Sequence, residues 1–497
     1  FLARAAARLP PASAAMSGAG AAAGPAGPQK GPAGGDPGKC EAGAPEEGVS
    51  EGTFPKKALL VYNAVAWVLI LAVVVLGIAT GAGAAVGLAI APLSMVFVIF
   101  VTFAGGRCRC LPEASASPSS GAPRVAWIDN AKVAMITLVA VGHTGMAFSF
   151  GGPMISLSPA TTWFSPAAVL GLLLLKPLVV PMFFFISGYF APPALDHKGP
   201  RHFMRANLLR LAPAYFVWWL AVNPLTEYMG YVLTRPAGDS YRYLPNSFHT
   251  WFLNWLLVFQ CCYALSAALP TVRRPVPKFA ALVGLSLAVS LMQLVASVAL
   301  GLAGSMGIAA GPMNGPGGDG FFSACSFGGG LLARRSGWLA KPLPPQLVHR
   351  SRVCVLCMAI VFAGTSFGLF SPPVADGSDG ARRAGMYSFF ALQIPSSAYW
   401  LCVQVCAIDV FQRRCNFENA FTRFVSSAAF TVYLVHMVFV NLYTFTWIKI
   451  LGLATADTPM GSGFVYMGFA YVAILTVTTS FALGGLLKKI PGVRSLL

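Results

Sequence analysis

Two ionisable residues lie eleven positions apart in one apolar stretch of the sequence. Lys132 stands near the start of this stretch, and His143 stands near its middle in the context Val-Gly-His-Thr. On an α-helix, eleven residues turn the chain roughly 20° past three full turns and advance it about 16 Å. Both side chains therefore face one direction. The spacing predicts a helix that carries a lysine at the membrane edge and a histidine near mid-membrane.

The histidine is the first candidate for chemistry, because an ionisable residue inside a membrane segment is a functional hypothesis by default. Imidazole can deprotonate a hydroxyl near neutral pH or act as a nucleophile. The structural alternative is that Lys132 anchors the helix at the membrane edge and His143 packs between helices with a hydrogen bond. Asp129 is expected to cap this helix and to pair with Lys132 one turn later.

Candidate binding residues follow at the end of a later apolar run. The run reads PMFFFISGYF from Pro181 and contains Ser187 and Tyr189. Arg201 and Arg205 come next, and guanidinium groups suit the phosphates of a nucleotide-type donor. Charge anchoring of a short loop is the alternative explanation of these arginines.

Another polar pair occurs near the C-terminus of the chain. Tyr433 and His436 are three residues apart, so on a helix they share a face that could approach the stripe of His143. A structural hydrogen-bonded pair is an equal interpretation. Cys354 and Cys357 form a CxxC pair without a second pair or nearby histidines, and we expect no metal site there.

The composition indicates which elements must carry these residues. Of 497 residues, 56% are hydrophobic and only 10% are charged, whereas soluble proteins contain about 25% charged residues. Apolar runs of about 20 residues match a hydrocarbon core of roughly 30 Å, and helices satisfy their own backbone hydrogen bonds in lipid. The sequence predicts an all-α, polytopic transmembrane bundle. Twelve spans are expected, at 58–80, 84–104, 131–150, 167–189, 211–232, 250–270, 280–302, 320–333, 352–370, 386–411, 425–447 and 463–486.

The span at 320–333 is short and rich in glycine, which suggests either a close helix contact or a broken helix. The helical bundle is preceded by residues 1–55, which contain almost no large apolar side chain and are expected to be disordered. The organisation predicted from this pattern is a disordered segment at 1–55, two spans at 58–104 and a membrane domain at 124–497.

The formal net charge is +18, which in a soluble protein would suggest nucleic acid as a partner. After residue 57, however, most lysines and arginines fall in alternate short loops instead of forming one basic module, which argues against nucleic acid. Under the positive-inside rule this distribution predicts that both termini are cytosolic.

Six strings resemble, in order, those of the acyltransferase-3 family of membrane-bound enzymes. They are the Lys132 to His143 spacing, Pro181 to Tyr189, Arg201 to Pro213, Trp251-Phe-Leu, Phe321 to Trp338 and Tyr433 to His436, followed by the tail Lys488 to Arg494. The family's first helix usually has arginine where this chain has Lys132. Lysine keeps the charge but lacks the planar fork of a guanidinium, so this residue would hold phosphate differently.

The resemblance implies a ten-helix core, to which the spans at 58–104 are an addition. It also implies an acyl-CoA donor that enters from the cytosol and an acceptor hydroxyl on a glycan, a lipid or a small metabolite, with no permanently bound cofactor. A dry site would avoid hydrolysis. The alternatives are a transporter or channel that uses the buried histidine and lysine for proton or ion coupling, and a non-catalytic scaffold.

The resemblance further assigns roles to individual residues. His143 would be a general base or a transient acyl acceptor. The donor phosphates would be held by Lys132, Arg201 and Arg205. Ser187 and Tyr189 would line the donor mouth, and His436 would orient the acceptor.

Overall fold

The fold is known from a computed structural model, which describes residues 125–148, 164–234, 241, 243, 248–268, 273–304, 320–369, 398–450 and 462–489. All of them belong to one compact unit, Phe54–Leu497. The N-terminal segment predicted at 1–55 and the two spans predicted at 58–104 lie outside the described residues.

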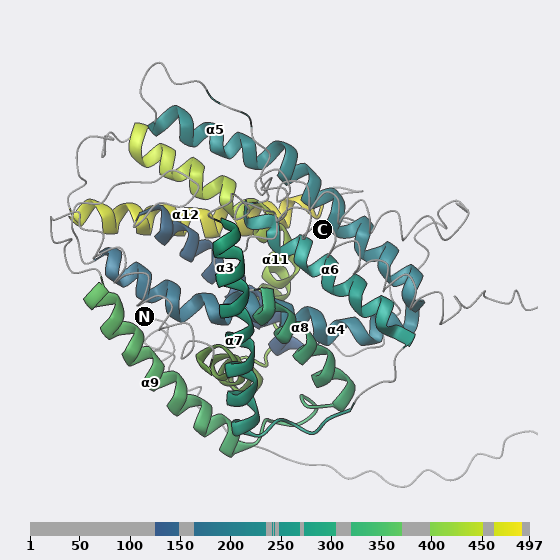
Figure 1. The fold of residues 1–497 in the computed structure, drawn as a ribbon. Helices are drawn as coiled ribbons and strands as arrows, with labels where there is room; N and C mark the ends of the chain where they lie inside the picture. The colour runs from purple at the N-terminus through teal and green to yellow at the C-terminus, as the bar shows by residue number, and fades with distance from the viewer. Residues whose placement is uncertain are drawn as a thin grey trace, which may run out of the picture. The chain divides into compact units, whose positions relative to one another are not determined.

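The described residues are helical and contain no β-strand, which confirms the all-α expectation for this part of the chain. The helices appear in Figure 1 in the following order: α3 (Ala126–Ala147), α4 (Phe164–Val217), η2 (Trp218–Val222), α5 (Asn223–Thr234), η3 (Phe248–Thr250), α6 (Trp251–Leu265), η4 (Ser266–Ala268), α7 (Phe279–Gly304), α8 (Gly320–Ser336), α9 (Pro345–Leu369), α11 (Ala420–Phe445), η5 (Thr446–Ile450) and α12 (Ser462–Leu487). A further helical segment covers 398–414.

Four stretches within the described residues are long and apolar enough to cross a membrane. They are Leu170–Val232, Pro345–Gly364, Ala420–Ile448 and Phe464–Leu487. Each satisfies the roughly 20-residue requirement of a hydrocarbon core. The helical part of the chain is therefore that of an integral membrane protein.

The first of these stretches corrects the prediction of two spans joined by a loop at 190–210. Helix runs through that region and is interrupted inside α4 at Gly199, with φ 70° and ψ 162°. A positive φ favours glycine, and Pro200 on its C-terminal side can begin a new helix because its missing N–H is not needed there. A one-residue break thus replaces the predicted loop.

Helix starts also differ from the expectation at α3 and α11. The residue preceding α3 is Val125, with no side-chain cap, so the prediction that Asp129 caps this helix is wrong. The helix α11 begins five residues before the predicted span. A capping box explains this start: Asn419 Oδ1 accepts from the Thr422 N–H at 2.8 Å, and Thr422 Oγ1 accepts from the Asn419 N–H at 2.9 Å.

The helices α4 and α8 pack with their backbones in contact. A Cβ atom added at Gly330 would collide with the carbonyl oxygen of Phe185, and one at Gly188 would collide with that of Phe327. Small residues permit such an approach between membrane helices. The close helix contact predicted for 320–333 is confirmed, whereas the broken helix is not, because α8 is continuous.

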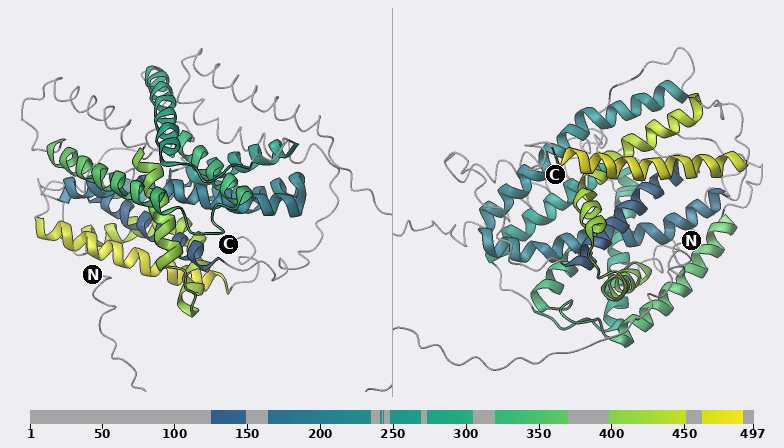
Figure 2. Two further views of the ribbon diagram at one scale, coloured as in Figure 1. Left: turned by 90° about the horizontal axis from the view of Figure 1, so that it is seen from below. Right: turned by 180° about the vertical axis from the view of Figure 1, so that it is seen from behind.

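A second group of packed helices consists of α3, α11 and α12. The views in Figure 2 show the dark blue α3 against the yellow-green α11 and the yellow α12. Ile136 of α3, Val432 of α11 and Phe481 of α12 are buried in one apolar cluster. This packing fixes the rotation of α3 and α11 about their axes and so decides which polar residues of the two helices meet.

Candidate active site

Three histidines from three separate elements meet beside this packed group. His143 comes from α3, His249 from the short turn η3, and His436 from α11. The Nδ1 atom of His143 lies 3.0 Å from Nε2 of His436, and the two rings stack with their centroids 5.2 Å apart. The His249 ring meets that of His436 edge to face, with centroids 5.1 Å apart. The predicted approach of His436 to His143 is confirmed.

The hydrogen bonds determine the tautomer of each ring in the pair. Nδ1 of His436 lies 2.7 Å from the carbonyl oxygen of Tyr433 and 3.1 Å from that of Val432. Carbonyl oxygens only accept, so Nδ1 of His436 carries the hydrogen. In the neutral ring Nε2 is then an acceptor, and the facing Nδ1–H of His143 donates to it. A neutral His143 therefore keeps its lone pair on Nε2.

This chain of bonds gives His143 the properties of an oriented base. Nε2 of His143 has no hydrogen-bond partner among the described residues, and the ring is half-buried. A base whose second nitrogen is held by a hydrogen bond is fixed in tautomer and direction. The two nitrogens of His436 are both engaged, and the residue is 0% exposed.

The third histidine is held by hydrogen bonds to α11 at both its backbone and its ring. Tyr433 Oη donates to the backbone carbonyl of His249 at 2.7 Å, and Nε2 of His249 lies 3.3 Å from the carbonyl oxygen of Leu434. Nε2 therefore carries the hydrogen. Nδ1 of His249 is buried without a hydrogen-bond partner in the described part of the chain, an unusual state for a buried polar atom.

His249 was not predicted from the sequence. The available signal was its position immediately before the expected span at 250–270 and the Trp251-Phe-Leu string. A lone histidine at a helix start resembles a surface residue, and nothing local indicates that Tyr433 and Leu434 lie against it.

Lys132 is on the same unbroken helix as His143, so the predicted separation of eleven residues applies along α3. Its Nζ atom lies 3.1 Å from Oδ1 of Asp129, which confirms the expected ion pair. The same ammonium stands 5.0 Å from the ring centroid of Phe190, a cation–π arrangement. Phe190 follows the PxFFFxSGY string of α4, so Lys132 is brought to that string.

The other predicted site residues lie on α4 on both sides of its break. Tyr189 is buried, and its hydroxyl accepts from Nη1 of Arg334 at 3.4 Å. Ser187 is half-buried. Beyond Gly199, Arg201 is exposed, whereas Arg205 is half-buried with an Nε atom that lacks a partner among the described residues. None of these side chains contacts the histidines in the described part of the structure.

The histidines do not form a metal centre of the usual kind. Among the residues that the structure describes, no group of three His, Cys, Asp or Glu side chains has the arrangement required to hold a metal ion. The hydrogen bonds of His436 occupy both of its nitrogens, so it offers no free lone pair.

The apolar helices are those of an integral membrane protein, and they hold the half-buried His143 against the buried His436. The family model of the acyltransferase domain matches residues 125–483, more than half of the chain. The protein therefore belongs to the acyltransferase-3 family and is an acyltransferase. No curated protein and no solved structure matched the chain.

Proposed function

We propose that this enzyme transfers an acyl group from acyl-CoA to a hydroxyl of a glycan, a lipid or a small metabolite. The observation that carries the proposal is the 3.0 Å contact between His143 and His436. Family membership favours acyl transfer over the transporter alternative. The acetyl group or a similar acyl group is the substrate class that the resemblance implies.

In the proposed step, Nε2 of His143 removes the proton from the acceptor hydroxyl. The oxygen attacks the thioester carbonyl carbon, a C–O bond forms, and the C–S bond breaks. The coenzyme A thiolate leaves and takes the proton back from the imidazolium. General-base catalysis of this kind contributes about 10²–10⁴-fold to a rate. An acyl group carried transiently on Nε2 is the second route open to the same nitrogen.

His436 positions His143 in this mechanism. The expectation that it orients the acceptor stays a prediction, and the hydrogen bonds of its Nδ1 and Nε2 to protein groups support a positioning role. The acceptor meets His249, whose buried Nδ1 can accept a hydrogen bond from another hydroxyl of the same molecule.

Donor binding is assigned to the cationic residues near the other end of α3. Lys132, Arg201 and Arg205 would contact donor phosphates, and Ser187 and Tyr189 would line the donor mouth. The side chain of Lys132 is 30% exposed, so a phosphate could contact it while it remains beside Asp129. Under the positive-inside rule this end of α3 and both termini are cytosolic, the side on which acyl-CoA is available.

The test is release of free coenzyme A by the detergent-purified full chain, supplied with acetyl-CoA and a mixture of hydroxyl acceptors. His143→Ala should abolish release while the protein stays folded and monodisperse. Lys132→Ala should raise the donor KM. Acyl-CoA binding without release in wild type would favour a scaffold, and substrate flux across vesicles without release would favour transport.

The base and the acyl carrier are separated by omitting the acceptor. An acyl-enzyme that forms with acyl-CoA alone, is detected by intact-protein mass spectrometry and is absent in His143→Ala would assign the carrier role. Release that strictly requires an acceptor, with no adduct, would assign the general base.

A further inference from the structure

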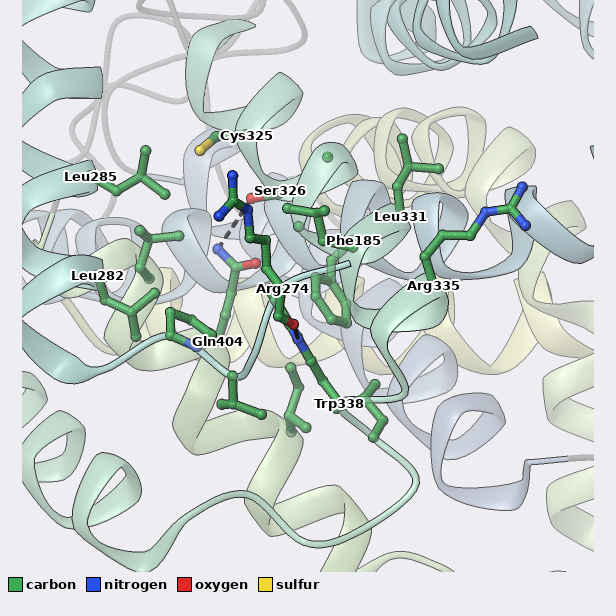
Figure 3. Close-up of a pocket in the computed structure, with 18 of the residues that line it drawn as sticks. Phe185, Arg274, Leu282, Leu285, Cys325, Ser326, Leu331, Arg335, Trp338 and Gln404 are labelled. Carbon is green, nitrogen blue, oxygen red and sulfur yellow. Dashed lines mark hydrogen bonds between the residues drawn. The ribbon is translucent and has the colours of Figure 1, made fainter. Parts of the chain in front are cut away.

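A large cavity lies apart from the three histidines. It is lined by α4, α6, η4, α7, α8, α9, the helical segment 398–414 and the residues just before α7, and its volume is about 1040 Å³. This volume is at the upper end of the roughly 300–1,000 Å³ typical of ligand sites. None of the three histidines lines the cavity. Figure 3 shows residues that line it.

The lining of the cavity is mostly apolar and contains three charged residues. Most of the lining is apolar and includes Leu282, Leu285 and Leu331. The charged members of the lining are Asp196, Arg274 and Arg335. An apolar chamber with a charged border fits a ligand that has an apolar body and a polar head.

The two arginines differ in whether they are available to a ligand. Arg335 donates to both carboxylate oxygens of Asp196, at 2.5 and 2.6 Å, and to Tyr263 Oη at 3.0 Å. Hydrogen bonding to Asp196 raises the pKa of Arg335 above its usual range, so this guanidinium is charged and already paired. In Figure 3 its side chain extends away from that of Arg274.

The guanidinium of Arg274 is the available positive charge. Its backbone N–H and carbonyl bond to Ser336 Oγ and to Trp338 Nε1, and its side chain has no carboxylate partner among the described residues. Figure 3 shows this side chain extending across the cavity in the direction of Ser326 and Gln404. The charge that a bound ligand would meet is therefore positive.

The depth of the cavity can be measured along α8. Cys325 and Arg335 both line it, and residues ten positions apart on an α-helix are separated by about 15 Å. This is half of the roughly 30 Å hydrocarbon core and thus the depth that one lipid acyl chain occupies in a leaflet. The length, the apolar wall and the positive charge all match a long acyl chain with an anionic head.

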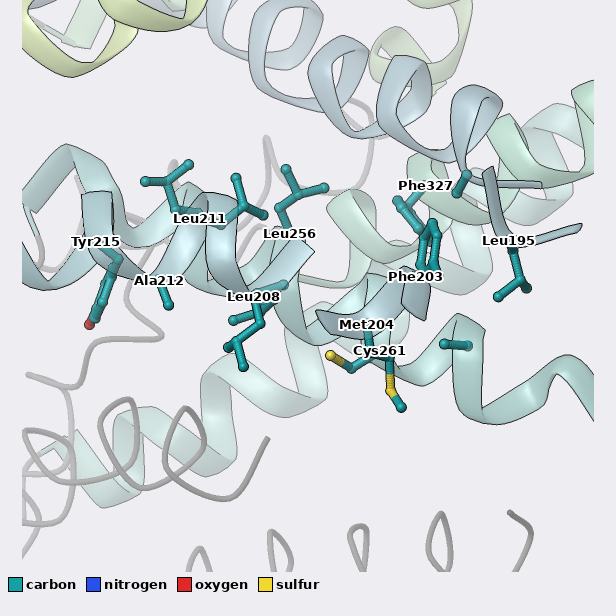
Figure 4. Packing of buried hydrophobic residues seen from close by; sticks show 14 of the residues in the cluster. Leu195, Phe203, Met204, Leu208, Leu211, Ala212, Tyr215, Leu256, Cys261 and Phe327 are labelled. Carbon is teal, nitrogen blue, oxygen red and sulfur yellow. The ribbon is translucent and has the colours of Figure 1, made fainter. Parts of the chain in front are cut away.

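The frame of the cavity is pre-formed. Leu195 of α4, Cys261 of α6 and Phe327 of α8 are buried in one apolar cluster, part of which appears in Figure 4. The direct backbone contact at Gly330 holds α4 against α8. Binding would therefore not require these helices to assemble first, which lowers its cost.

We propose that this cavity binds a long-chain fatty acyl group, with its anionic head at Arg274 and its chain among the leucines of α7 and α8. Two ligands share this chemistry: a long-chain acyl-CoA and an anionic phospholipid of the surrounding leaflet. Only binding of acyl-CoA rests on the proposed function. Neither ligand needs chemistry at His143 in order to occupy the cavity.

Glycines allow the cavity to be filled without disturbing the backbone. Gly328 lines it, and a Cβ atom added there meets nothing within 4 Å. Gly328→Leu should therefore insert a side chain into the cavity. Gly364→Leu is the matched control, because Gly364 lies on α9, is equally open and does not line the cavity. Arg274→Gln has a similar control in Arg273→Gln at the exposed neighbouring position.

The experiment measures equilibrium binding of radiolabelled palmitoyl-CoA to the purified full chain, with acetyl-CoA as the short-chain probe. A second arm uses nanodiscs of phosphatidylcholine with or without phosphatidylglycerol and identifies retained lipid by native mass spectrometry. Gly328→Leu and Arg274→Gln should each weaken the long-chain ligand by about tenfold, whereas both controls should bind as wild type does.

The arms distinguish the two ligands. Palmitoyl-CoA binding that phosphatidylglycerol does not displace, and that Gly328→Leu weakens, identifies long-chain acyl-CoA as the ligand of the cavity. Retained phosphatidylglycerol that is lost in Gly328→Leu identifies the lipid. The proposal is overturned if wild type binds neither long-chain probe, or if Gly328→Leu binds both as wild type does. His143→Ala should still bind the long-chain ligand. Loss of acyl transfer in this variant would therefore test the proposed function and leave the cavity proposal unaffected.

Discussion

The histidine cluster and the cavity are built in opposite ways. In the cluster, main-chain carbonyls of Val432, Tyr433 and Leu434 accept hydrogen bonds from the imidazoles and fix their direction. In the cavity, the wall is mostly apolar, and Gly328 presents open space to the ligand volume. The histidine cluster fixes the positions of individual nitrogen atoms. The cavity selects a ligand by its length, its shape and the sign of its charge.

This difference predicts two kinds of response to substitution. Removal of one hydrogen-bond partner abolishes the whole interaction and leaves the other buried polar atom unsatisfied. Contact with an apolar wall is lost in proportion to the area that is removed. Changes in the cluster should therefore act on the rate of chemistry, and changes in the cavity should act on affinity in graded steps.

The largest expected effect tests the contact between α4 and α8, which frames the cavity. Gly330→Val places side-chain atoms where the backbone of α4 already lies, so it should prevent stable packing of α8 and greatly reduce the yield of monodisperse protein. Gly328→Val, two residues away with open space at its Cβ position, should purify with a melting temperature close to wild type. Equal melting temperatures for the two variants would contradict the helix contact.

The next effect concerns the histidine pair. His436→Leu removes the acceptor for Nδ1–H of His143 and should lower kcat by about 10²–10³-fold, with donor affinity retained, because His143 loses its orientation. His436→Gln offers an amide oxygen near the position of Nε2 and should recover part of the rate. A merely structural role for His436 predicts no difference between the two variants in kcat per folded molecule.

A smaller effect is expected at the third histidine. His249→Phe removes the buried Nδ1 acceptor while keeping a ring against Tyr433 and His436. The acceptor KM should rise by about tenfold, the cost of one lost hydrogen bond, with a smaller change in kcat. A fall in kcat as large as that of His436→Leu, at unchanged acceptor KM, would assign His249 to the chemistry instead.

The smallest effect is expected where the site is most exposed. Asp129→Asn removes the ion-pair partner of Lys132, whose side chain is 30% exposed. Exposed pairs contribute about 0–1 kcal/mol, so the donor KM should change by no more than about fivefold. The change should shrink as salt is raised. Asn130→Ala removes the hydrogen bonds that Asn130 Nδ2 donates to the carbonyl oxygens of Cys415 and Phe417. It serves as the control for a general disturbance of the start of α3.

Local features of the fold could be predicted from the sequence, and features made by distant segments could not. The register of Lys132 and His143 follows from helix geometry, and the pair of Asp129 with Lys132 follows from a spacing of three residues. The contact between His143 and His436 was anticipated because each lies on a polar face of an apolar helix. These predictions required only the periodicity of single helices.

Other features depend on which helices become neighbours. His249 acquires its environment from α11, more than 180 residues later, and the cavity is assembled from several elements. The break at Gly199 was missed because the cluster of cations around it suggested a loop, whereas helix continues on both sides. The donor and acceptor roles of the predicted residues remain predictions.

The glycine contact between α4 and α8 also predicts which missense substitutions the protein can accept. Every amino acid other than glycine has a Cβ atom, so every missense change at Gly330 places an atom against the Phe185 carbonyl, and every one at Gly188 against the Phe327 carbonyl. At Gly328 the same kinds of change meet open space. Positions 328 and 330 of one helix should therefore show opposite tolerance when folded protein is the readout, and a deep mutational scan of α8 scored by protein abundance would show Gly330 as intolerant and Gly328 as permissive.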